Sequence, residues 1–305
     1  MTKIFIDGSA GTTGLRIHER LSGRDDITLI TLPDEVRKDI SARRDALNSA
    51  DIAFLCLPDA AAIEAVSLVE NPNTAIIDTS TAHRVSDGWI YGFPELDNRY
   101  EQIKSGKRIA NPGCHASGFL SLVRPLVANG LIDSSEKLTA FSLTGYTGGG
   151  KKMIAEYEND KPTLYDAPRQ YGLSQKHKHL PEMSKIAGLD NAPVFCPIVG
   201  DFACGMEVTV PLFASQVKGK LADIIEVYKN YYTGKIVRYC DETEDGFMSA
   251  GLMAGKDGLI VSAHGNDERI ILTARFDNLG KGASGAALQN MNVILGVDET
   301  LGLEI

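Results

Sequence analysis

Residues 2–17 read "TKIFIDGSAGTTGLRI", and this stretch decides the fold. An apolar run ends at Asp7, three glycines follow in a GxxGxxG pattern, and a helical pattern begins near residue 13. A strand that leads through glycines into a helix is typical of the first βα unit of a parallel sheet, where backbone N–H groups at the helix N-terminus bind a dinucleotide pyrophosphate. The stretch therefore predicts a nucleotide site made of Gly8, Ser9, Ala10, Gly11, Thr12, Thr13 and Gly14.

The same alternation continues along the first third of the chain. Short apolar runs at 27–32, 51–57 and 74–80 alternate with helical patterns at 39–49 and 59–70, which indicates a parallel, doubly wound sheet. After about residue 136 strand-like segments follow one another with fewer helices between them, which favours antiparallel pairing. These segments are 137–146, 206–214, 258–265 and 268–276, and a final helical pattern covers 284–296. We therefore expect an α/β chain with a Rossmann-like domain and an α+β domain that has a largely antiparallel sheet.

Composition narrows the classes of function. The chain has 305 residues, 43% hydrophobic residues and a formal net charge of −9, with no run rich in lysine or arginine. A nucleic-acid partner is therefore not expected, because phosphate binding needs clustered basic side chains. No apolar run approaches the roughly 20 residues that span a bilayer, and no secretory signal pattern opens the chain, so we expect a cytoplasmic protein. Five cysteines without a CxxC pair indicate neither a disulfide framework nor a metal site.

Charges after the second predicted strand bear on the choice of cofactor. An acidic residue at this point binds the ribose hydroxyls of NAD, whereas basic residues neutralise the 2′-phosphate of NADP. Asp34 stands close to this point, but Arg37 and Lys38 follow it. The local charge pattern leaves both cofactors open.

The stretch "NPGCHASGFLSLV", residues 111–123, contains a candidate nucleophile. Apolar residues repeat at helical spacing from Phe119, which predicts a helix over 115–129 with Cys114 as its N-cap and a kink or break at Pro125. The positive end of a helix favours the thiolate form of a cysteine placed there. A structural thiol packed in the core is the alternative, because most free cysteines are of that kind.

Two histidines are candidate proton partners for this thiol. His177 and His179 are two residues apart in "KHKHLPEM", so in an extended segment their side chains point to the same side. The neighbouring Lys176 and Lys178 disfavour imidazolium and keep a base neutral. An exposed basic loop is the competing interpretation.

Two further stretches could bind an anion. "DTSTAHR" follows the fourth predicted strand and offers Ser80 and Arg84, and "TGYTGGGKK" offers Gly148 and Gly149 with Lys151. Loops after parallel strands collect ligands, and glycine-rich backbone can surround an anion. Each stretch could equally be a solvated turn.

Taken together, these motifs resemble the N-acetyl-γ-glutamyl-phosphate reductases, which are related to aspartate-semialdehyde and glyceraldehyde-3-phosphate dehydrogenases. The resemblance covers nearly the whole chain and is carried by "GSAGTTG", "STAHR", "YGFPEL", "ANPGCHASG", "TGYTGGGKK", "HKHLPEM" and "DNLGKGASGAALQNMN". It implies that Cys114 attacks an acyl phosphate, that His177 or His179 is the acid/base, and that NADP(H) carries the hydride. Departures occur at "TGGGKK" and at Lys178, where the family often has other residues.

The resemblance also implies a division of the chain and a set of binding residues. Residues 1–113 and 284–305 would bind the dinucleotide, and residues 114–283 would carry catalysis and oligomerisation, as a dimer or tetramer. Besides the glycine-rich stretch, the implied cofactor residues are Arg37, Lys38, Ser80 and Gly282. The implied substrate residues are Arg84, Asn111, Gly148, Gly149 and Lys151.

Three other functions stay compatible with the residues alone. A sibling reductase of aspartyl phosphate would use the same cysteine and histidine. A hydrolase or acyltransferase would use the Cys/His pair without a nucleotide. A nucleotide-sensing protein would bind the cofactor without redox chemistry.

Overall fold

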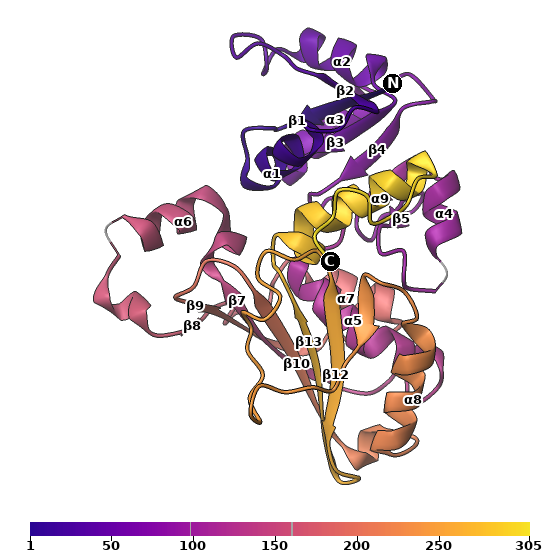
Figure 1. Cartoon of the computed structure of the whole chain (residues 1–305), viewed down its shortest axis with the longest axis vertical. Coiled ribbons are helices and arrows are strands. Elements are labelled where there is room, and N and C mark those ends of the chain that lie inside the picture. The colour runs from indigo at the N-terminus through magenta and orange to yellow at the C-terminus, as the bar shows by residue number, and fades with distance from the viewer. Residues whose placement is uncertain (98, 160) are drawn as a thin grey trace. The chain divides into compact units, whose positions relative to one another are not determined.

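The computed structural model describes residues 1–97, 99–159 and 161–305, and the chain divides into two compact units (Figure 1). The first, called the N-terminal unit below, contains Met1–Pro112 and Ala283–Gly302. The second, called the central unit, contains Gly113–Gly282 and Leu303–Ile305.

The N-terminal unit is built on a six-stranded parallel sheet with the order β2-β1-β3-β4-β6-β5. Its strands are β1 (Thr2–Asp7), β2 (Ile27–Ile30), β3 (Ile52–Leu55), β4 (Ala75–Asp78), β5 (Ile90–Tyr91) and β6 (Arg108–Ala110). Its helices are α1 (Thr12–Leu21), α2 (Ile40–Ser49), α3 (Asp59–Ser67), α4 (Arg99–Ser105) and α9 (Gly285–Leu295). Strand β3 is buried along its whole length, as expected for an inner strand covered on both faces. The predicted doubly wound parallel sheet is confirmed.

Helix α9 joins the N-terminal unit although it lies far along the chain from the rest of it. It contacts α4 and β4. The Asn290 amide donates to the carbonyl of Gly92 at 2.9 Å, and the Gln289 amide donates to Glu95 at 2.9 Å. Both asparagine and glutamine side chains are buried, so these hydrogen bonds satisfy polar groups that would otherwise be costly.

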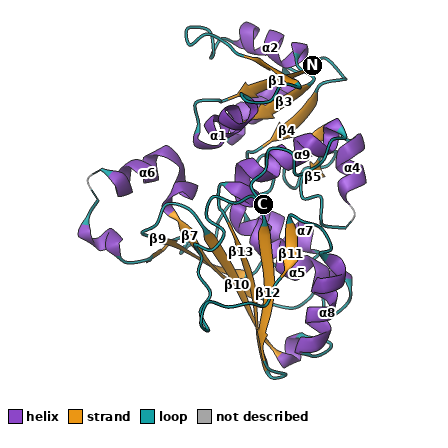
Figure 2. Ribbon diagram, in the orientation of Figure 1, coloured by secondary structure: helices purple, strands orange, loops and turns teal. Residues whose placement is uncertain are grey.

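The central unit contains a seven-stranded sheet with the order β11-β12-β13-β10-β7-β9-β8 (Figure 2). The strands are β7 (Thr139–Gly145), β8 (Arg169–Gln170), β9 (Val194–Gly200), β10 (Met206–Phe213), β11 (Val237–Tyr239), β12 (Leu259–Gly265) and β13 (Arg269–Phe276). The helices are α5 (Cys114–Ala128), α6 (Gly150–Glu158), α7 (Leu180–Ala187) and α8 (Leu221–Tyr231). The pairs β7/β9 and β11/β12 are parallel and the other pairs are antiparallel, so the predicted largely antiparallel sheet is confirmed.

Helix α5 corrects the expected N-cap and is continuous where a kink or break was expected. Its N-cap is Gly113 in an extended conformation, and Cys114 is its first helical residue rather than its cap. The helix also runs through Pro125 without a break. Proline removes the N–H that would bond to the carbonyl four residues earlier, but the Tyr232 hydroxyl donates to that carbonyl, of Ser121, at 2.7 Å. The side chain of Tyr232, at the C-terminal end of the helix at 221–231, thus supplies the missing donor.

Packing fixes α5 against the sheet. Gly118 leaves no room for a side chain, because an added Cβ would lie 2.8 Å from the Phe276 ring. The Tyr228 hydroxyl donates to the carbonyl of Leu122 at 2.6 Å. The middle of α5 is thereby held on a rigid support within the central unit.

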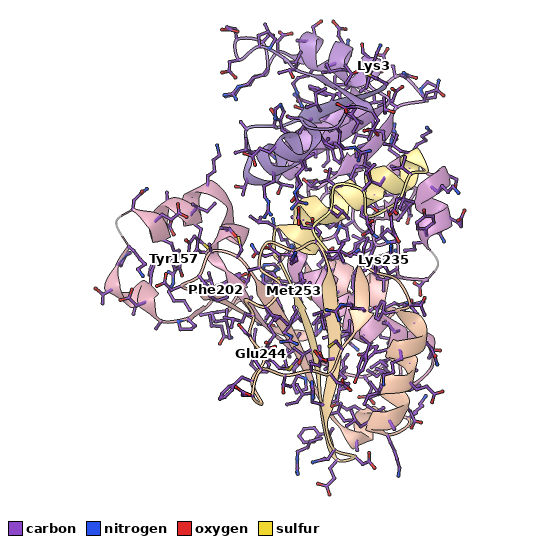
Figure 3. The ribbon with its side chains drawn as sticks, viewed as in Figure 1. Lys3, Tyr157, Phe202, Lys235, Glu244 and Met253 are labelled. Atoms are coloured by element: carbon purple, nitrogen blue, oxygen red, sulfur yellow. The ribbon has the colours of Figure 1, made fainter. Side chains whose placement is uncertain are left out.

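Helix α6 belongs to the segment that connects β7 to β8. Tyr157, labelled in Figure 3, stacks on Tyr146 and accepts hydrogen bonds from the Arg169 guanidinium at 2.8 and 3.2 Å. The guanidinium also stacks over the Tyr165 ring at 3.2 Å. Cation–π contacts of this kind stabilise a segment that has little core of its own. Among the described residues, no helix is both long enough and apolar enough to cross a membrane.

Candidate nucleotide site and active site

The glycine-rich turn forms one wall of a cavity in the N-terminal unit. The cavity has a volume of about 520 Å³, and Gly8, Ser9, Ala10 and Gly11 line it. Gly8 has φ +88°, and Gly14 cannot hold a side chain because its Cβ would lie 2.9 Å from the Ser9 Cα. Gly11 is the N-cap of α1, so the N–H groups of Thr12 and Thr13 stand at the start of the helix. The turn therefore has the close backbone and helix N-terminus that a pyrophosphate needs.

Charged residues that follow β2 also line the cavity. Asp34, Arg37 and Lys38 line it, as the charge pattern after β2 suggested. Arg37 forms an exposed ion pair with Asp34 at 3.5 Å. Exposed pairs of this type contribute little to stability, so Arg37 can exchange its partner for a ligand phosphate at small cost.

A buried ion pair that the sequence did not suggest, between Asp7 and Arg43, also lines the cavity. The Arg43 guanidinium donates to Asp7 at 3.0 and 3.1 Å and to Glu64 at 2.8 Å. Burial raises the pKa of Asp7, and the hydrogen bond from Arg43 opposes that rise. The pair supports the end of β1 from which the glycine-rich turn leaves.

Cys114 lies in the central unit at the start of α5. Its side chain is partly exposed, and its Cβ would lie 2.9 Å from a Cβ placed on Gly282. The turn carrying Gly282 is held by Asp277, whose carbonyl accepts from the Gly282 N–H at 3.0 Å. In contrast, burial raises the pKa of the Cys56 thiol to about 12, so that thiol stays protonated near neutral pH.

The two predicted histidines lie beside the residues that flank Cys114. The ring centroids of His177 and His179 are 5.4 and 5.5 Å from that of His115. His179 is buried, and its Nε2 lies 3.9 Å from Glu182. The other Glu182 oxygen accepts from the Gly113 N–H at 3.1 Å. One buried carboxylate therefore contacts both the histidine segment and the cap of the cysteine helix.

His115 itself is part of a hydrogen-bonded row. Its Nδ1 is 2.7 Å from the Ser142 hydroxyl, and its Nε2 is 2.6 Å from the Tyr171 hydroxyl. Burial, and then the nearby His177 and Lys178, lower the pKa of His115 to about 3, so the ring is neutral near pH 7. Burial and the neighbouring Cys114 raise the pKa of Tyr171, which keeps its phenol protonated.

Arg84, Asn111 and Ser80 lie together in the N-terminal unit, and all three are buried. The Arg84 guanidinium donates to the carbonyls of Asn111 and Thr79 at 2.9 and 3.0 Å. The Ser80 hydroxyl donates to Asp78 at 2.8 Å, and Asp78 also contacts His83 at 2.6 Å. These contacts organise the loop after β4.

Asn111 is bonded on both sides of its amide. Its Nδ2 donates to the carbonyl of Ala283 at 3.0 Å, and its Oδ1 accepts from Asn290 at 3.2 Å. The ligand roles predicted for Ser80, Arg84 and Asn111 stay predictions.

The predicted glycine cradle lies in the central unit. Gly148 and Gly149 belong to a 3₁₀ turn over Tyr146–Gly149, and Gly150 opens α6. Gly148 lies beside the Asn278 amide, which donates to Thr147 at 2.9 Å, and Lys151 is exposed. The cradle and Lys151 stay predicted substrate residues, as Gly282 stays a predicted cofactor residue.

Sequence reasoning missed three residues that contact the candidate site, namely His115, Tyr171 and Glu182. His115 could have been found from its place next to Cys114. Glu182 follows the paired histidines within one helical turn, a spacing that brings side chains together. Tyr171 carried no local signal, because its partner His115 is 56 residues away.

Comparison with known families assigns both parts of the chain to one class. Residues 3–105 match the NAD binding domain of semialdehyde dehydrogenases, and residues 114–278 match the dimerisation domain of semialdehyde dehydrogenases. Solved structures agree at the level of the fold. Aspartate semialdehyde dehydrogenase II from Vibrio cholerae superposes with a TM-score of 0.72 at 15% identity, covering 97% of this chain and 98% of its own. The protein is a semialdehyde dehydrogenase in fold and domain content.

Closer relatives narrow the class. N-acetyl-gamma-glutamyl-phosphate reductase 2 from Nostoc sp. is 45% identical over 99% of this chain and 99% of its own length. N-acetyl-gamma-glutamyl-phosphate reductase from Brucella ovis is 46% identical over 96% of this chain and 99% of its own. The chain belongs to the N-acetyl-gamma-glutamyl-phosphate reductase family, which confirms the resemblance seen in its motifs.

Proposed function

We propose that the protein reduces N-acetyl-L-glutamyl 5-phosphate to N-acetyl-L-glutamate 5-semialdehyde and phosphate, with NADPH as reductant. The chemistry is supported above all by one observation: Cys114 starts a helix whose flanking residues contact two histidines and a buried glutamate. The choice of substrate, and with it a role in arginine biosynthesis, rests on the names of the relatives. A biosynthetic enzyme of this type would work in the cytoplasm.

Cys114 supplies the nucleophile in this proposal. Its sulfur attacks the acyl carbon, the carbon–oxygen bond to phosphate breaks, and a thioester on Cys114 results as phosphate leaves. N–H groups in the first turn of α5 can stabilise the oxygen that becomes negative during attack. After reduction, the carbon–sulfur bond breaks, the aldehyde leaves and the thiol is restored.

His179 is the acid/base in this proposal. We assign the proton of the neutral ring to Nε2, which lies 3.9 Å from Glu182, so that Nδ1 is the atom that accepts a proton. Nδ1 of His177 instead accepts from the backbone N–H of His179 at 3.2 Å. This bond stabilises the local backbone and occupies the nitrogen that would otherwise accept a proton. A carboxylate that orients a histidine in this way is a common arrangement for an activated nucleophile.

The cavity of the N-terminal unit fits a dinucleotide. Its volume of about 520 Å³ lies in the usual range for small-molecule sites, and the glycine-rich turn fits the pyrophosphate. Arg37 and Lys38 would bind a ribose 2′-phosphate, which favours NADPH over NADH. When bound, NADPH supplies the hydride that reduces the thioester.

A turnover assay tests substrate, reaction and cofactor together. The oxidative direction uses N-acetylglutamate semialdehyde, phosphate and either NADP⁺ or NAD⁺, with aspartate semialdehyde as the parallel substrate. We expect turnover with the acetylated semialdehyde and NADP⁺. Faster turnover of aspartate semialdehyde would assign the protein to the sibling activity, and no turnover of either would refute the reductase proposal.

The double substitution Arg37→Ser and Lys38→Ser is expected to raise the KM for NADPH by roughly 10- to 100-fold, because charge-assisted hydrogen bonds to the 2′-phosphate are lost. The KM for NADH should change by less than about 2-fold, since NADH has no such phosphate. Steady-state kinetics with both cofactors measure this. Lys104→Ser, on α4 outside the cavity lining, is the matched control. An unchanged KM for NADPH would remove both residues from the site.

We further propose that two copies pair through the open face of the central sheet. Phe141, Val194, Phe213 and Ile271 are 44%, 56%, 65% and 47% exposed. Strand register puts them on one face: Phe141 is opposite Thr209 on β10, and Ile271 is opposite Pro211. Apolar patches of this kind are typical of interfaces, and the matched family domain is described as a dimerisation domain.

Part of the same face is already covered by the chain itself. The segment 240–256 carries Glu244 and Met253, both labelled in Figure 3. The Glu244 carboxylate accepts from the buried Arg275 guanidinium at 2.8 Å. The segment 240–256 therefore covers one part of this sheet face, and the apolar patch is the part that stays exposed.

Phe213→Asp combined with Ile271→Asp is expected to convert a dimer or tetramer into smaller species, because charges on an apolar interface are costly to bury. Sedimentation velocity at micromolar concentration measures the mass of each species. Ile63→Asp, an equally exposed apolar position on α3, is the control and should leave the mass unchanged. A monomeric wild-type protein would refute the pairing.

A further inference from the structure

Three polar groups of the central unit form a continuous row, and one of them, His115, directly follows Cys114 in α5. Ser142 comes from β7, His115 is the second residue of α5, and Tyr171 directly follows β8. The two hydrogen bonds of the row measure 2.7 and 2.6 Å. The Tyr171 backbone N–H also donates to the carbonyl of Pro197 at 3.0 Å, which anchors the residue at the sheet edge.

The surroundings of the row keep it rigid. Ser142 and His115 are buried, and the His115 ring lies edge-on to Phe195 at 5.2 Å and to His177 at 5.4 Å. His179 and Lys178 are further basic groups near the ring, and the Cys114 thiol contributes to the raised pKa of Tyr171. With the imidazole neutral and the phenol protonated near pH 7, all three members of the row are uncharged.

A neutral imidazole has one donor and one acceptor, so the row has two arrangements. In the first, the Tyr171 hydroxyl donates to Nε2 of His115, and Nδ1–H donates to Ser142. In the second, the Ser142 hydroxyl donates to Nδ1, Nε2–H donates to the Tyr171 oxygen, and the Tyr171 proton points to another acceptor. Each group has one proton in both arrangements, so none enters or leaves the row.

We infer that Ser142 and His115 are positioning residues that hold the Tyr171 hydroxyl as a hydrogen-bond donor to negative charge at Cys114. The charge is that of the thiolate before attack and of the acyl oxygen during attack, so the inference rests on the function proposed above. The second arrangement of the row supplies this donor, and in it the Ser142 hydroxyl provides the proton that Nδ1 of His115 accepts. Hydrogen bonds to a charged group are about twice as strong as neutral ones, which makes such a donor effective.

A substrate-free experiment tests the row first. Alkylation of Cys114 by iodoacetamide is followed by mass spectrometry across pH in the wild type, Tyr171→Phe and His115→Phe. We expect the rate at pH 7 to fall about 10-fold in both variants and the midpoint of the pH profile to rise by about one unit, as the thiolate loses a donor. Profiles that match the wild type in Tyr171→Phe would overturn the inference.

A double-mutant cycle then tests whether His115 acts through Tyr171. Each single variant should lower kcat by about 10- to 100-fold with little change in KM, and the combined variant should be within about 2-fold of Tyr171→Phe alone. Multiplicative losses would show that His115 acts independently and would overturn the inference.

Conservative variants separate positioning from packing. His115→Gln offers a donor and an acceptor and should recover part of the alkylation rate, and Ser142→Thr, which keeps the hydroxyl, should exceed Ser142→Ala in kcat. Phe195→Leu, which changes a ring neighbour of His115 without a hydrogen bond, is the control and should lower kcat by less than about 3-fold. If His115→Phe does not fold, Tyr171→Phe and the comparison of Ser142→Thr with Ser142→Ala still test the inference.

The two proposals fail in different ways. A wild-type protein that does not turn over the semialdehyde, but whose Cys114 alkylation depends on Tyr171, would refute the reductase function alone. A wild-type protein that turns it over, with kcat and alkylation unchanged in Tyr171→Phe, would refute the row alone.

Discussion

Replacing Cys114 by serine is expected to lower kcat for phosphate-dependent oxidation of N-acetylglutamate semialdehyde by at least about 10⁴-fold. A hydroxyl is nearly fully protonated at neutral pH, and it forms an ester in place of the reactive thioester. The side chains have similar size, and Cys114 is partly exposed, so the fold should not change. Stopped assays for turnover and thermal unfolding for stability measure the two parts of the prediction.

Cys196→Ser is the control for general effects of losing a thiol. Cys196 lies on β9 in the same unit and is half-buried like Cys114. This variant should keep kcat within about 2-fold of the wild type, as expected for a substitution away from the site. Turnover by Cys114→Ser within about 10-fold of the wild type would exclude a thioester mechanism.

Removing the imidazole of His179 is the second large effect that we expect. His179→Ala should lower kcat by roughly 10²- to 10⁴-fold, because proton transfer to and from the sulfur and the acyl oxygen loses its partner. His177→Ala should instead raise KM and lower kcat by less than about 10-fold, since Nδ1 of His177 makes a local backbone bond. Steady-state kinetics in both directions separate the two variants.

His264→Ala is the matched control for this comparison. His264 lies on β12 in the central unit. Its substitution should leave kcat within about 3-fold of the wild type. A larger kcat loss in His177→Ala than in His179→Ala would make His177 the acid/base. Small kcat losses in both variants would exclude both histidines from the mechanism.

The fold could be predicted from the sequence where the physical signal is local. Strand β3 is buried along its whole length and β1 is buried from Ile4 onward, so they appear as continuous apolar runs, and the glycines after β1 identify the first turn. Strands β5 and β8 have two residues each, which is too short for a period to appear. The N-cap of α5 was predicted one residue late because Gly113 has no side chain to signal a cap.

The candidate active site was predictable only in part, because only some of its residues carry a local signal in the sequence. Cys114 stands at a helix start that the apolar spacing marks, whereas the partners of His115 are 27 and 56 residues away. Arg84 was predicted as a ligand clamp, but its carbonyl partners depend on the folded loop after β4. Contacts between distant segments follow from tertiary packing and leave no pattern in a single sequence.

The tyrosine that bonds to the carbonyl opposite Pro125 limits how this protein can change over generations. While Pro125 is present, loss of the Tyr232 hydroxyl leaves the Ser121 carbonyl buried without its donor. If a residue with an N–H first replaces Pro125, the tyrosine becomes dispensable, because the helix then supplies its own donor. Replacing Pro125 first and Tyr232 second is therefore tolerated, whereas the reverse order passes through a destabilised protein. The residue allowed at the C-cap of α8 thus depends on the residue at position 125 of α5.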